Sequence, residues 1–340
     1  MKSTQQRNHP ITIKDVAKLA GVSIATVSRI MNGTATVSTD LTEKVQSAIA
    51  QLGYSSNNVA RALKAKESCS IGLIIPDIEN PFFPTLVRSI EDTARSYGNS
   101  IMLCNSDGKA QEEKRYIEFL YSKRVDGLIF TGGVDCEASL ALLESLPIPS
   151  VILDRRAMNK KMHSVLVDNY YGAQLAVEHL LKSGCEKIAF IGGVEQISVA
   201  QDRYQGYRDT LKKNHREFDA RLVHLDEFTF ESGYRGMQSL LEQKVSFDAV
   251  FAGNDIMAFG VIECLINHGL QVPADVLVVG YDDIWMAKWY KPSLTTICQP
   301  VYDIGKAAVD LLMQLRENPR LKVQEKIFKP ELVIRNSTSR

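Results

Sequence analysis

From residue 69 to the end of the chain, short runs of hydrophobic residues alternate with longer amphipathic stretches. The short runs have the length of buried strands, and the longer stretches repeat hydrophobic positions every three or four residues, as amphipathic helices do. The expected strands are 70–76, 100–104, 125–130, 149–153, 187–193, 221–225, 249–253 and 276–283, and the expected helices are 82–97, 110–123, 137–145, 172–183, 201–214, 231–243 and 256–268. Strict alternation of strand and helix predicts parallel sheets with helices on both faces.

This number of strand–helix units is more than one doubly wound sheet holds comfortably. The neighbourhood of residues 166–168 divides the units into two halves of similar length. We therefore expect an α/β protein whose main domain has two lobes, each built on its own doubly wound parallel sheet.

The first 54 residues follow a different pattern, which predicts three short helices. Thr12 is an N-cap signal for a first helix that ends at Gly21, and Ser23 is an N-cap signal for a second helix that stops at residues 32–33. A third helix is expected over about 39–52. Two helices joined by a glycine-containing turn and followed by a supporting helix form the helix-turn-helix arrangement.

The charge distribution separates these two parts of the chain. Over all 340 residues the 40 Lys and Arg balance the 40 Asp and Glu, so the formal net charge is zero. Residues 1–66, however, hold nine Lys and Arg against three Asp and Glu, a net charge of +6, which leaves −6 on the remainder. A basic segment attached to an acidic body is typical of a nucleic-acid-binding unit joined to a different domain.

In a helix-turn-helix unit the second helix enters the major groove, and its N-terminal residues face the base edges. Arg29 can donate two hydrogen bonds to guanine, while Ile24 and Ala25 can contact thymine methyl groups. Hydroxyl and amide side chains suit phosphate oxygens, which fix the register of the protein on DNA. The expected DNA-contacting residues of this segment are Thr12, Ser23, Ile24, Ala25, Thr26, Ser28, Arg29 and Asn32. A small helical subdomain with solvated charges is the alternative interpretation.

Residues 15–33 read DVAKLAGVSIATVSRIMNG, and this string resembles the lactose-repressor (LacI/GalR) family of bacterial transcription regulators. The resemblance covers essentially the whole chain, including a body similar to periplasmic sugar-binding proteins. It implies a homodimer whose two headpieces bind the half-sites of a pseudo-palindromic operator in double-stranded DNA. Six dispersed cysteines and an N-terminus without an apolar stretch predict a cytoplasmic protein, which we expect to be nucleoid-associated when it is bound to the operator.

Residues 55–66 resemble the hinge helix of that family, which orders only on the operator. There a leucine wedges into a central base step from the minor groove and kinks the duplex, and the resemblance gives this role to Leu63. Ser56 stands where many members have proline, and the alternative is that Val59 and Leu63 merely pack on the body. The residues expected to contact DNA here are Asn57, Ala60, Arg61 and Leu63.

Polar and aromatic residues follow several expected strands, where the loops of parallel sheets meet ligands. Each alone has an ordinary explanation, such as core packing, a surface ion pair or a helix cap. Together they resemble the ligand set of ribose-binding proteins and ribose repressors, in which carboxylates, amides and arginines bind sugar hydroxyls and aromatic rings cover C–H faces. The expected ligand residues are Asn80, Phe82, Phe83, Asp154, Arg155, Arg203, Phe228, Asn254, Asp282 and Gln299.

The resemblance also implies how the chain is divided and how it works. The expected parts are a headpiece (1–54), a hinge helix (55–66), a first lobe (67–167 with 297–327) and a second lobe (168–296 with 328–340). The chain is expected to cross between the lobes near 168, 296 and 328, with a final strand over about 327–335 in the second lobe. A small sugar, ribose or a related pentose, is expected to bind between the lobes as an inducer that weakens operator binding.

The sequence argues against an enzyme. No G-x-G-x-x-G or phosphate-binding loop follows an expected strand, and the six histidines belong to no catalytic or metal-binding pattern. With arginines beside them, Asp154 and Asp282 are expected to be ionised hydrogen-bond acceptors rather than acid–base catalysts. We expect no cofactor and no metal. No hydrophobic run has the length of a membrane span, so no membrane partner is expected.

Several other functions stay open. A purine-type regulator would use a base as corepressor, and a catabolite-control-type regulator, which residues 300–312 resemble, would sense a phosphorylated carrier protein. A sugar-transport binding protein would leave the basic residues 1–66 unexplained. An enzyme that acts on sugars is the most distant alternative.

Overall fold

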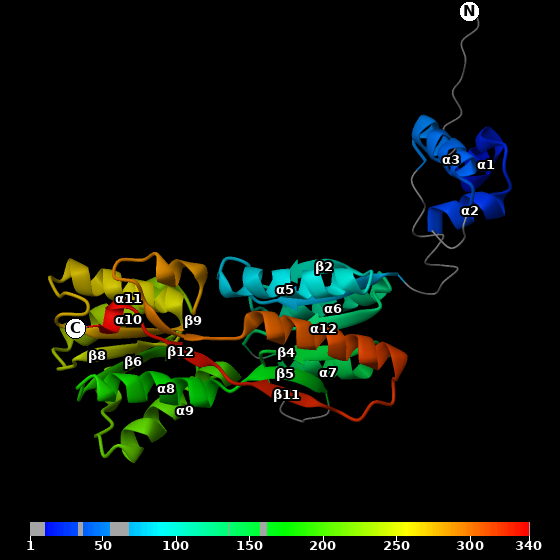
Figure 1. The fold of residues 1–340 in the computed structure, drawn as a ribbon. Coiled ribbons are helices and arrows are strands. Elements are labelled where there is room, and N and C mark those ends of the chain that lie inside the picture. Colours follow the sequence, from blue (N-terminus) through cyan, green and yellow to red (C-terminus); the bar gives the residue numbers. More distant parts are fainter. Residues whose placement is uncertain (1–10, 33–36, 55–67, 135, 157–161, 340) are drawn as a thin grey trace, which may run out of the picture. The chain divides into compact units, whose positions relative to one another are not determined.

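The computed structural model describes residues 11–32, 37–54, 68–134, 136–156 and 162–339, and Figure 1 shows its fold. The described residues form two compact units, one within residues 1–68 and the other within residues 69–340. In this part of the chain, no helix is both long and apolar enough to cross a membrane.

The first unit consists of three helices, which confirms the expected elements: α1 (Ile13–Ala20), α2 (Ile24–Asn32) and α3 (Thr39–Leu52). The start of α1 is fixed by Asp15, whose carboxylate accepts hydrogen bonds from the backbone N–H of Thr12 at 2.8 Å and from its hydroxyl at 2.7 Å. The start of α2 is fixed by Ser23, whose hydroxyl oxygen accepts from the N–H of Thr26 at 3.1 Å. Gly21 ends α1 with φ of +65°, a left-handed conformation that favours glycine.

The core of this unit is small. One buried cluster joins the three helices, and it consists of Val16, Ala17, Val27, Val45 and Ala48. Val27 lies on the inner side of α2, whereas Ile24 and Ala25 at the start of that helix are exposed.

The second unit contains two six-stranded sheets. The first sheet has the order β11-β5-β4-β3-β1-β2, with β1 (Ser70–Ile75), β2 (Ser100–Asn105), β3 (Gly127–Phe130), β4 (Ser150–Leu153), β5 (His163–Val167) and β11 (Glu325–Phe328). The second has the order β12-β10-β9-β8-β6-β7, with β6 (Ile188–Gly193), β7 (Val223–Asp226), β8 (Ala249–Ala252), β9 (Leu277–Asp282), β10 (Thr295–Cys298) and β12 (Glu331–Val333). Neighbouring strands are parallel except β10 and β12, which are antiparallel.

Helices cover both sheets, as the alternating pattern predicts. The first lobe is the first sheet with α5 (Phe82–Ser96), α6 (Ala110–Ser122), α7 (Glu137–Ser145) and α12 (Val301–Glu317). The second lobe is the second sheet with α8 (Asn169–Lys182), α9 (Ser198–Lys213), α10 (Phe230–Glu242) and α11 (Asp255–Asn267). Three short 3₁₀ turns lie in the second lobe, at Ala220–Leu222, Trp285–Lys288 and Asn336–Thr338. Figure 1 shows the two lobes side by side.

The chain passes between the lobes three times, after β5, after β10 and after β11. The expected final strand over 327–335 is wrong in its first part, because residues 327 and 328 belong to β11 of the first sheet and only Glu331–Val333 form β12. The three crossings follow residues 167, 298 and 328, close to the expected 168, 296 and 328, but β10 keeps residues 297 and 298 in the second sheet, whereas the expected boundary gave them to the first lobe.

Three strands were not predicted from the pattern of hydrophobic residues, each for a physical reason. β5 follows β4 more closely than the dozen or so residues of a helical crossover, so the alternation of strand and helix does not reveal it. β11 lies at the edge of its sheet and alternates exposed with half-buried residues, so it has no hydrophobic run. β10 is a short strand rich in threonine.

Candidate functional site

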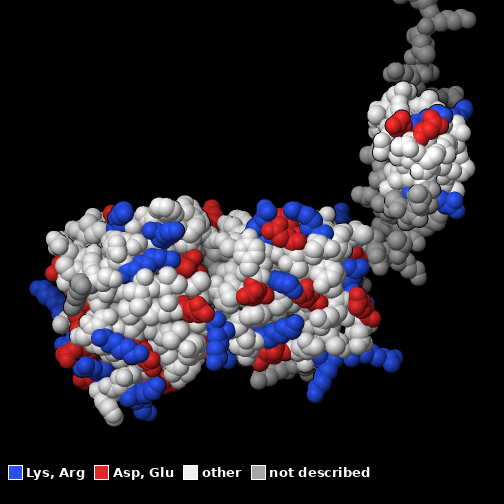
Figure 2. Space-filling view, in the orientation of Figure 1, with Lys and Arg blue, Asp and Glu red and all other residues white. Residues whose placement is uncertain are grey.

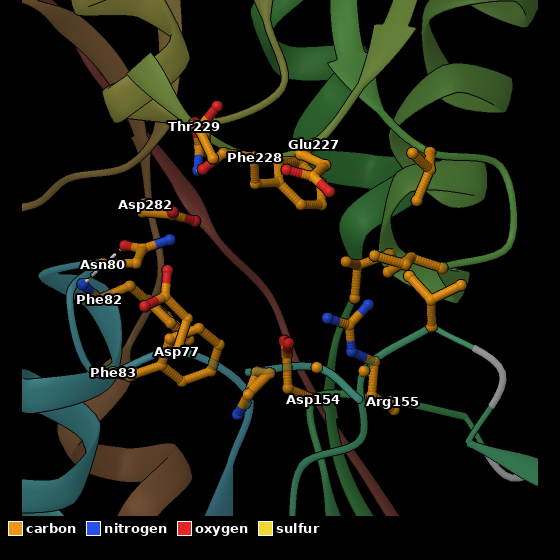
Figure 3. A pocket seen from close by; sticks show the side chains of 18 of the residues that line it. Asp77, Asn80, Phe82, Phe83, Asp154, Arg155, Glu227, Phe228, Thr229 and Asp282 are labelled. Atoms are coloured by element: carbon orange, nitrogen blue, oxygen red, sulfur yellow. Dashed lines mark hydrogen bonds between the residues drawn. The ribbon is translucent and has the colours of Figure 1, made fainter. Parts of the chain in front are cut away.

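A cavity of about 490 Å³ lies between the two lobes (Figure 3), within the size range of small-molecule sites. Its lining comes from the segments that follow the carboxyl ends of strands in both sheets, where parallel sheets bind ligands. All ten residues that the sequence analysis selected line this one cavity: Asn80, Phe82, Phe83, Asp154, Arg155, Arg203, Phe228, Asn254, Asp282 and Gln299.

The first lobe contributes an aromatic wall. Phe82 and Phe83 begin α5, and their rings meet edge to face with centroids 5.2 Å apart. Asn80 sets this turn, because its side-chain oxygen accepts from the N–H of Phe82 at 3.1 Å and its backbone carbonyl accepts from the N–H of Phe83 at 3.0 Å. Both rings also belong to the hydrophobic core, so Phe82 and Phe83 are core residues and cavity-lining residues at the same time.

The first lobe also contributes a buried charged pair that follows β4. Asp154 has φ of +63°, and its side chain and that of Arg155 are both buried, so an exposed surface ion pair is excluded as the explanation. Among the described residues, nothing accepts a hydrogen bond from Nε or Nη1 of Arg155. Burial lowers the pKa of Arg155, although the neighbouring Asp154 opposes this change. Figure 3 shows the guanidinium extending into the cavity toward the second lobe.

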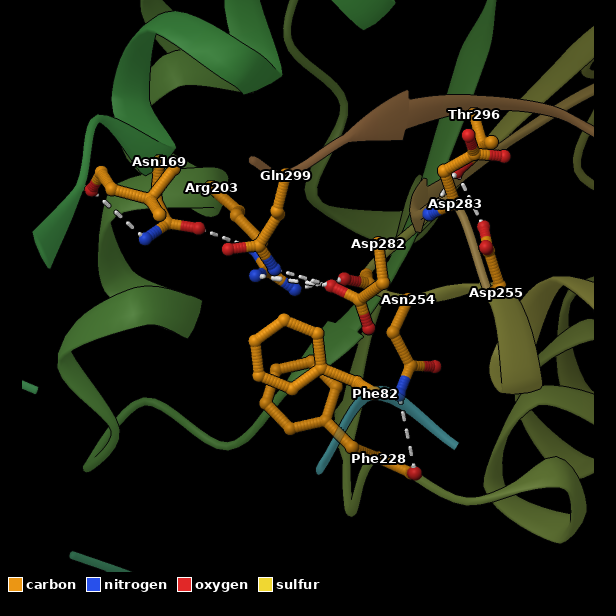
Figure 4. A network of polar contacts seen from close by, with 12 residues as sticks. Phe82, Asn169, Arg203, Phe228, Asn254, Asp255, Asp282, Asp283, Thr296 and Gln299 are labelled. Atoms are coloured by element: carbon orange, nitrogen blue, oxygen red, sulfur yellow. Dashed lines mark hydrogen bonds and ion pairs between the residues drawn. The ribbon is translucent and has the colours of Figure 1, made fainter. Parts of the chain in front are cut away.

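The second lobe holds its arginine in a complete network (Figure 4). Arg203 donates from Nε to the side-chain oxygen of Asn169 at 2.9 Å and from Nη1 to the carbonyl of Gly253 at 2.6 Å. Its guanidinium lies 3.6 Å from the centre of the Tyr281 ring, and its Nη2 lies 3.6 Å from a carboxylate oxygen of Asp282. This arginine is therefore fixed by the protein itself.

Asp282 is the central acceptor of this wall. Its carboxylate accepts from Nε2 of Gln299 at 2.7 Å, and the remaining oxygen of the Gln299 amide has no partner among the described residues. Burial raises the pKa of Asp282 to about 7; Arg203 and Gln299 oppose this rise, and Asp154 adds to it. The expectation that Asp282 is an ionised acceptor stays a prediction, and burial acts against it while Arg203 and Gln299 favour it.

Asn254 and Phe228 complete the second-lobe wall. The side-chain oxygen of Asn254 caps α11 by accepting from the N–H of Met257 at 2.8 Å, and its amide donates to the carbonyl of Phe228 at 3.4 Å. The helix-cap explanation thus applies to Asn254, which lines the cavity at the same time. Phe228 lies 5.7 Å from the Arg203 guanidinium.

Charged residues at other strand ends also line the cavity and were not among the expected ligand residues. Asp77 follows β1, Asp107 and Lys109 follow β2, and Glu227 follows β7, and all four line the cavity. The position after a strand, which selected the ten expected residues, could have selected these as well. The apolar side chains of the lining that were not expected are those of Pro76, Val134, Val194, Ile197 and Val199.

In the first unit, the start of α2 carries the residues expected to contact DNA. Ser23, Ile24, Ala25 and Arg29 are exposed, and Ile24 is an exposed large hydrophobic residue with 45% of its surface accessible. Thr12 is also exposed, whereas Thr26 and Ser28 are half-buried. The side chain of Asn32 and the expected hinge residues Asn57, Ala60, Arg61 and Leu63 lie outside the described residues.

The charge of the described surface is mixed. Five of the nine basic residues of segment 1–66 lie outside the described residues, so the structure does not display most of its positive charge. In α3, Lys44 and Asp40 pair at 2.7 Å. Figure 2 shows acidic and basic residues interspersed over the face of the two lobes that it displays.

A helix-turn-helix unit and a two-lobed, ligand-binding α/β domain in one chain define a ligand-responsive DNA-binding regulator. Residues 12–57 match the family model described as bacterial regulatory proteins of the lacI family, and residues 68–330 match the model of periplasmic binding proteins and the sugar binding domain of the LacI family. The chain belongs to the LacI family. It is a sugar-responsive, DNA-binding transcriptional repressor rather than an enzyme.

Related proteins of known name cover nearly the whole chain. The ribose operon repressor of Halalkalibacterium halodurans is 39% identical over 96% of this chain and 97% of its own length. The transcriptional repressor PurR of Glaesserella parasuis is 38% identical over 96% of this chain and 98% of its own length. These two differently named relatives match at nearly the same identity, so overall identity does not identify the particular effector, and the lining of the cavity has to do so.

Solved structures show the same architecture. The Lac repressor dimer bound to operator and an anti-inducer matches with a TM-score of 0.85 and 30% identity, covering 97% of this chain and 99% of that one. A LacI family regulator from Enterococcus faecium with bound ribose matches with a TM-score of 0.70 and 32% identity, covering 79% of this chain and 98% of that one.

Proposed function

We propose that the effector of this repressor is ribose or a closely related pentose, bound in the cavity between the lobes. The observation that carries this proposal is the convergence of all ten expected ligand residues on one cavity. The ribose-bound regulator from Enterococcus faecium, whose fold this chain shares, supports it.

The lining matches the chemistry of a sugar. Sugar hydroxyls both donate and accept, so they need acceptors and donors at fixed positions. Asp282 and the free oxygen of the Gln299 amide supply acceptors, and Nε and Nη1 of Arg155 supply donors that no described residue occupies. Phe82 and Phe228, one from each lobe, supply rings for the C–H faces.

The headpiece (1–54) reads the operator in this proposal. Exposed Arg29 contacts guanine, exposed Ile24 and Ala25 contact thymine methyl groups, and the hydroxyl residues bind phosphates. The hinge (55–66) enters the minor groove through Leu63. Because the Lac repressor structure is a dimer bound to operator, we propose that this chain also acts as a homodimer on a pseudo-palindromic site. It works in the cytoplasm and is nucleoid-associated when bound.

Sugar acts as an inducer in this proposal. Ligand stabilises one arrangement of the two lobes, and this arrangement separates the hinge segments of the dimer and weakens operator binding. The coupling is reciprocal, so operator weakens sugar binding by the same factor.

A thermal-shift screen of the full chain tests the effector. We expect D-ribose to raise the melting temperature in a concentration-dependent way, since a ligand that binds only the folded state stabilises it by mass action. D-xylose, D-glucose, hypoxanthine and guanine are the comparison ligands, and hypoxanthine tests a purine-type effector directly. A shift with the purines and none with any sugar would overturn the proposed effector.

Arg29→Ala tests the proposed reading helix. Loss of two hydrogen bonds to one guanine is expected to cost about 1–3 kcal/mol of operator affinity, roughly a fivefold to 150-fold loss, and to relax specificity at one base pair. The thermal shift with D-ribose serves as the control and should equal that of the unsubstituted chain. Unchanged operator recognition would mean that α2 does not read bases through Arg29.

A further inference from the structure

The two lobes meet through a polar contact beside the effector cavity. Arg156 of the first lobe donates from its guanidinium to the carboxylate of Asp202 in α9 of the second lobe. Its backbone N–H donates to the hydroxyl oxygen of Ser198, also in α9, at 3.3 Å. One residue of the first lobe thus contacts the second lobe through both its side chain and its backbone.

This contact is directly connected to the ligand residues through the chain. Arg156 follows Arg155, and Asp202 precedes Arg203, so each lobe places a cavity-lining arginine next to a residue of the cross-lobe pair. Neither Arg156 nor Asp202 lines the effector cavity. A shift of the pair would therefore move both cavity-lining arginines, although neither member of the pair lines the cavity itself.

An apolar contact lies on the same side of the cavity. Val134 of the first lobe packs against the cluster of Ile197, Val199 and Ala200 at the start of α9. Arg156, Ser198 and Asp202 line a second, smaller cavity of about 230 Å³, and Val199 lines both cavities. The pair of Arg156 and Asp202 therefore lies outside the effector cavity, next to residues such as Val199 that form its wall.

The surroundings of Asp202 disfavour its ionised form, and Arg156 offsets this effect. The Asp202 side chain is 25% exposed, and burial raises its pKa even though Arg156 opposes the rise. Asp168 adds to the rise, and Arg203 opposes it more weakly. Without Arg156, a desolvated carboxylate would face another carboxylate, so the arrangement that buries Asp202 between the lobes would lose population.

We propose that Arg156 and Asp202 are positioning residues of the effector cavity: their ion pair across the lobes sets how tightly the sugar binds without contacting the sugar. This inference rests on the proposed function, since it concerns the same cavity. The apparent affinity of a ligand falls with the fraction of molecules in the binding-competent arrangement. Because half of the Arg156 side chain is exposed, at 49%, the pair is a modest one, and we expect its loss to weaken sugar binding about two- to fivefold.

A charge-swap cycle tests this inference in the full chain, with Arg156→Asp, Asp202→Arg and the double variant. Calorimetric titration with D-ribose should show two- to fivefold weaker binding for each single variant and recovery in the double variant. Arg216→Ala is the matched control, because Arg216 is similarly exposed and pairs with Glu186 inside the second lobe, at 3.2 Å. This control should bind D-ribose like the unsubstituted chain.

Hydrogen exchange without sugar gives a second readout that does not depend on the effector. Backbone amides of residues 150–156 and 197–203 should exchange faster in the single variants, return toward normal in the double variant, and stay unchanged in Arg216→Ala. If the unsubstituted chain does not bind D-ribose, the proposed function fails, and exchange alone decides whether the pair holds the lobes. Single variants with unchanged affinity and unchanged exchange would overturn the inference, as would a double variant no better than either single one.

Discussion

The two walls of the effector cavity use the same residue type in opposite ways. In the second lobe, Arg203 is held by Asn169, Gly253, Tyr281 and Asp282, so its position is set before any ligand arrives. In the first lobe, Arg155 is equally buried but keeps two nitrogen donors without a described partner. The second-lobe wall therefore presents Asp282 as a hydrogen-bond acceptor that the protein already holds in place. The first-lobe wall presents the donors of Arg155, which we expect a ligand to bind.

Replacement of Arg155 by methionine should have the largest effect on binding. We expect D-ribose affinity to fall at least about a hundredfold, since the acceptors of the sugar would lose a charged donor. The stability of the ligand-free chain should fall less than in Arg203→Met, because no hydrogen bond from Nε or Nη1 to a described residue is lost, although Asp154 loses a neighbouring cation. Calorimetric titration and urea unfolding measure the two effects. A large loss of stability would show that Arg155 is structural.

Replacement of Arg203 by methionine should, in contrast to Arg155→Met, mainly reduce the stability of the chain. Removal of the guanidinium leaves the buried Asp282, Asn169 and the carbonyl of Gly253 without their cation, which we expect to cost about 3 kcal/mol of unfolding free energy. Sugar binding should be lost as well. Urea unfolding of this variant beside Arg155→Met gives the test, and equal stability of the two would mean that the walls do not differ as described.

The pH dependence of stability should follow Asp282. Its pKa in the folded chain is raised to about 7, above the ordinary aspartate value near 4, so the folded chain holds more protons than the unfolded chain between these values. The contribution of this group to stability is therefore greatest at low pH and is lost as the pH rises toward 7. Asp282→Asn should flatten this part of the profile relative to the unsubstituted chain. Parallel profiles over pH 4.5–7.5 would contradict the raised pKa.

The smallest expected effect separates the two roles of Asn254. Asn254→Ala removes the cap of α11 and should cost about 1 kcal/mol of stability. Asn254→Ser keeps a capping oxygen for the N–H of Met257, so it should keep most of that stability while it removes the amide that donates to the carbonyl of Phe228. Thermal unfolding reports the cap, and calorimetric titration with D-ribose reports the cavity. Equal loss of stability in both variants would mean that the cap is not the source of the effect.

Much of this structure could be predicted from the sequence. The helix-turn-helix bounds follow from local signals at Thr12, Gly21 and Ser23, which are short-range and physical. The alternation of strands and helices predicts the two lobes, and the position of polar residues after strands selects residues that line one cavity. These features depend on local pattern, which a single sequence carries.

The rest depends on contacts between distant segments. Nothing local in residues 325–328 reveals that they extend the first sheet beside β5, because an edge strand needs no continuous hydrophobic run. Burial of Asp282 between Arg203, Gln299 and Asp154 raises its pKa, and the sequence does not show that environment. The pair of Arg156 and Asp202 joins the lobes across a long separation in the chain and has no sequence pattern of its own.

The coupling between cavity and operator is the central claim, and one titration tests it most directly. The full chain is titrated against the duplex that it selects from a random library, by fluorescence anisotropy at fixed salt, with and without saturating D-ribose. We predict that D-ribose weakens operator binding at least about tenfold, within the usual range of allosteric coupling. Identical operator affinity with and without D-ribose, in a chain shown by calorimetry to be saturated with the sugar, would contradict the account.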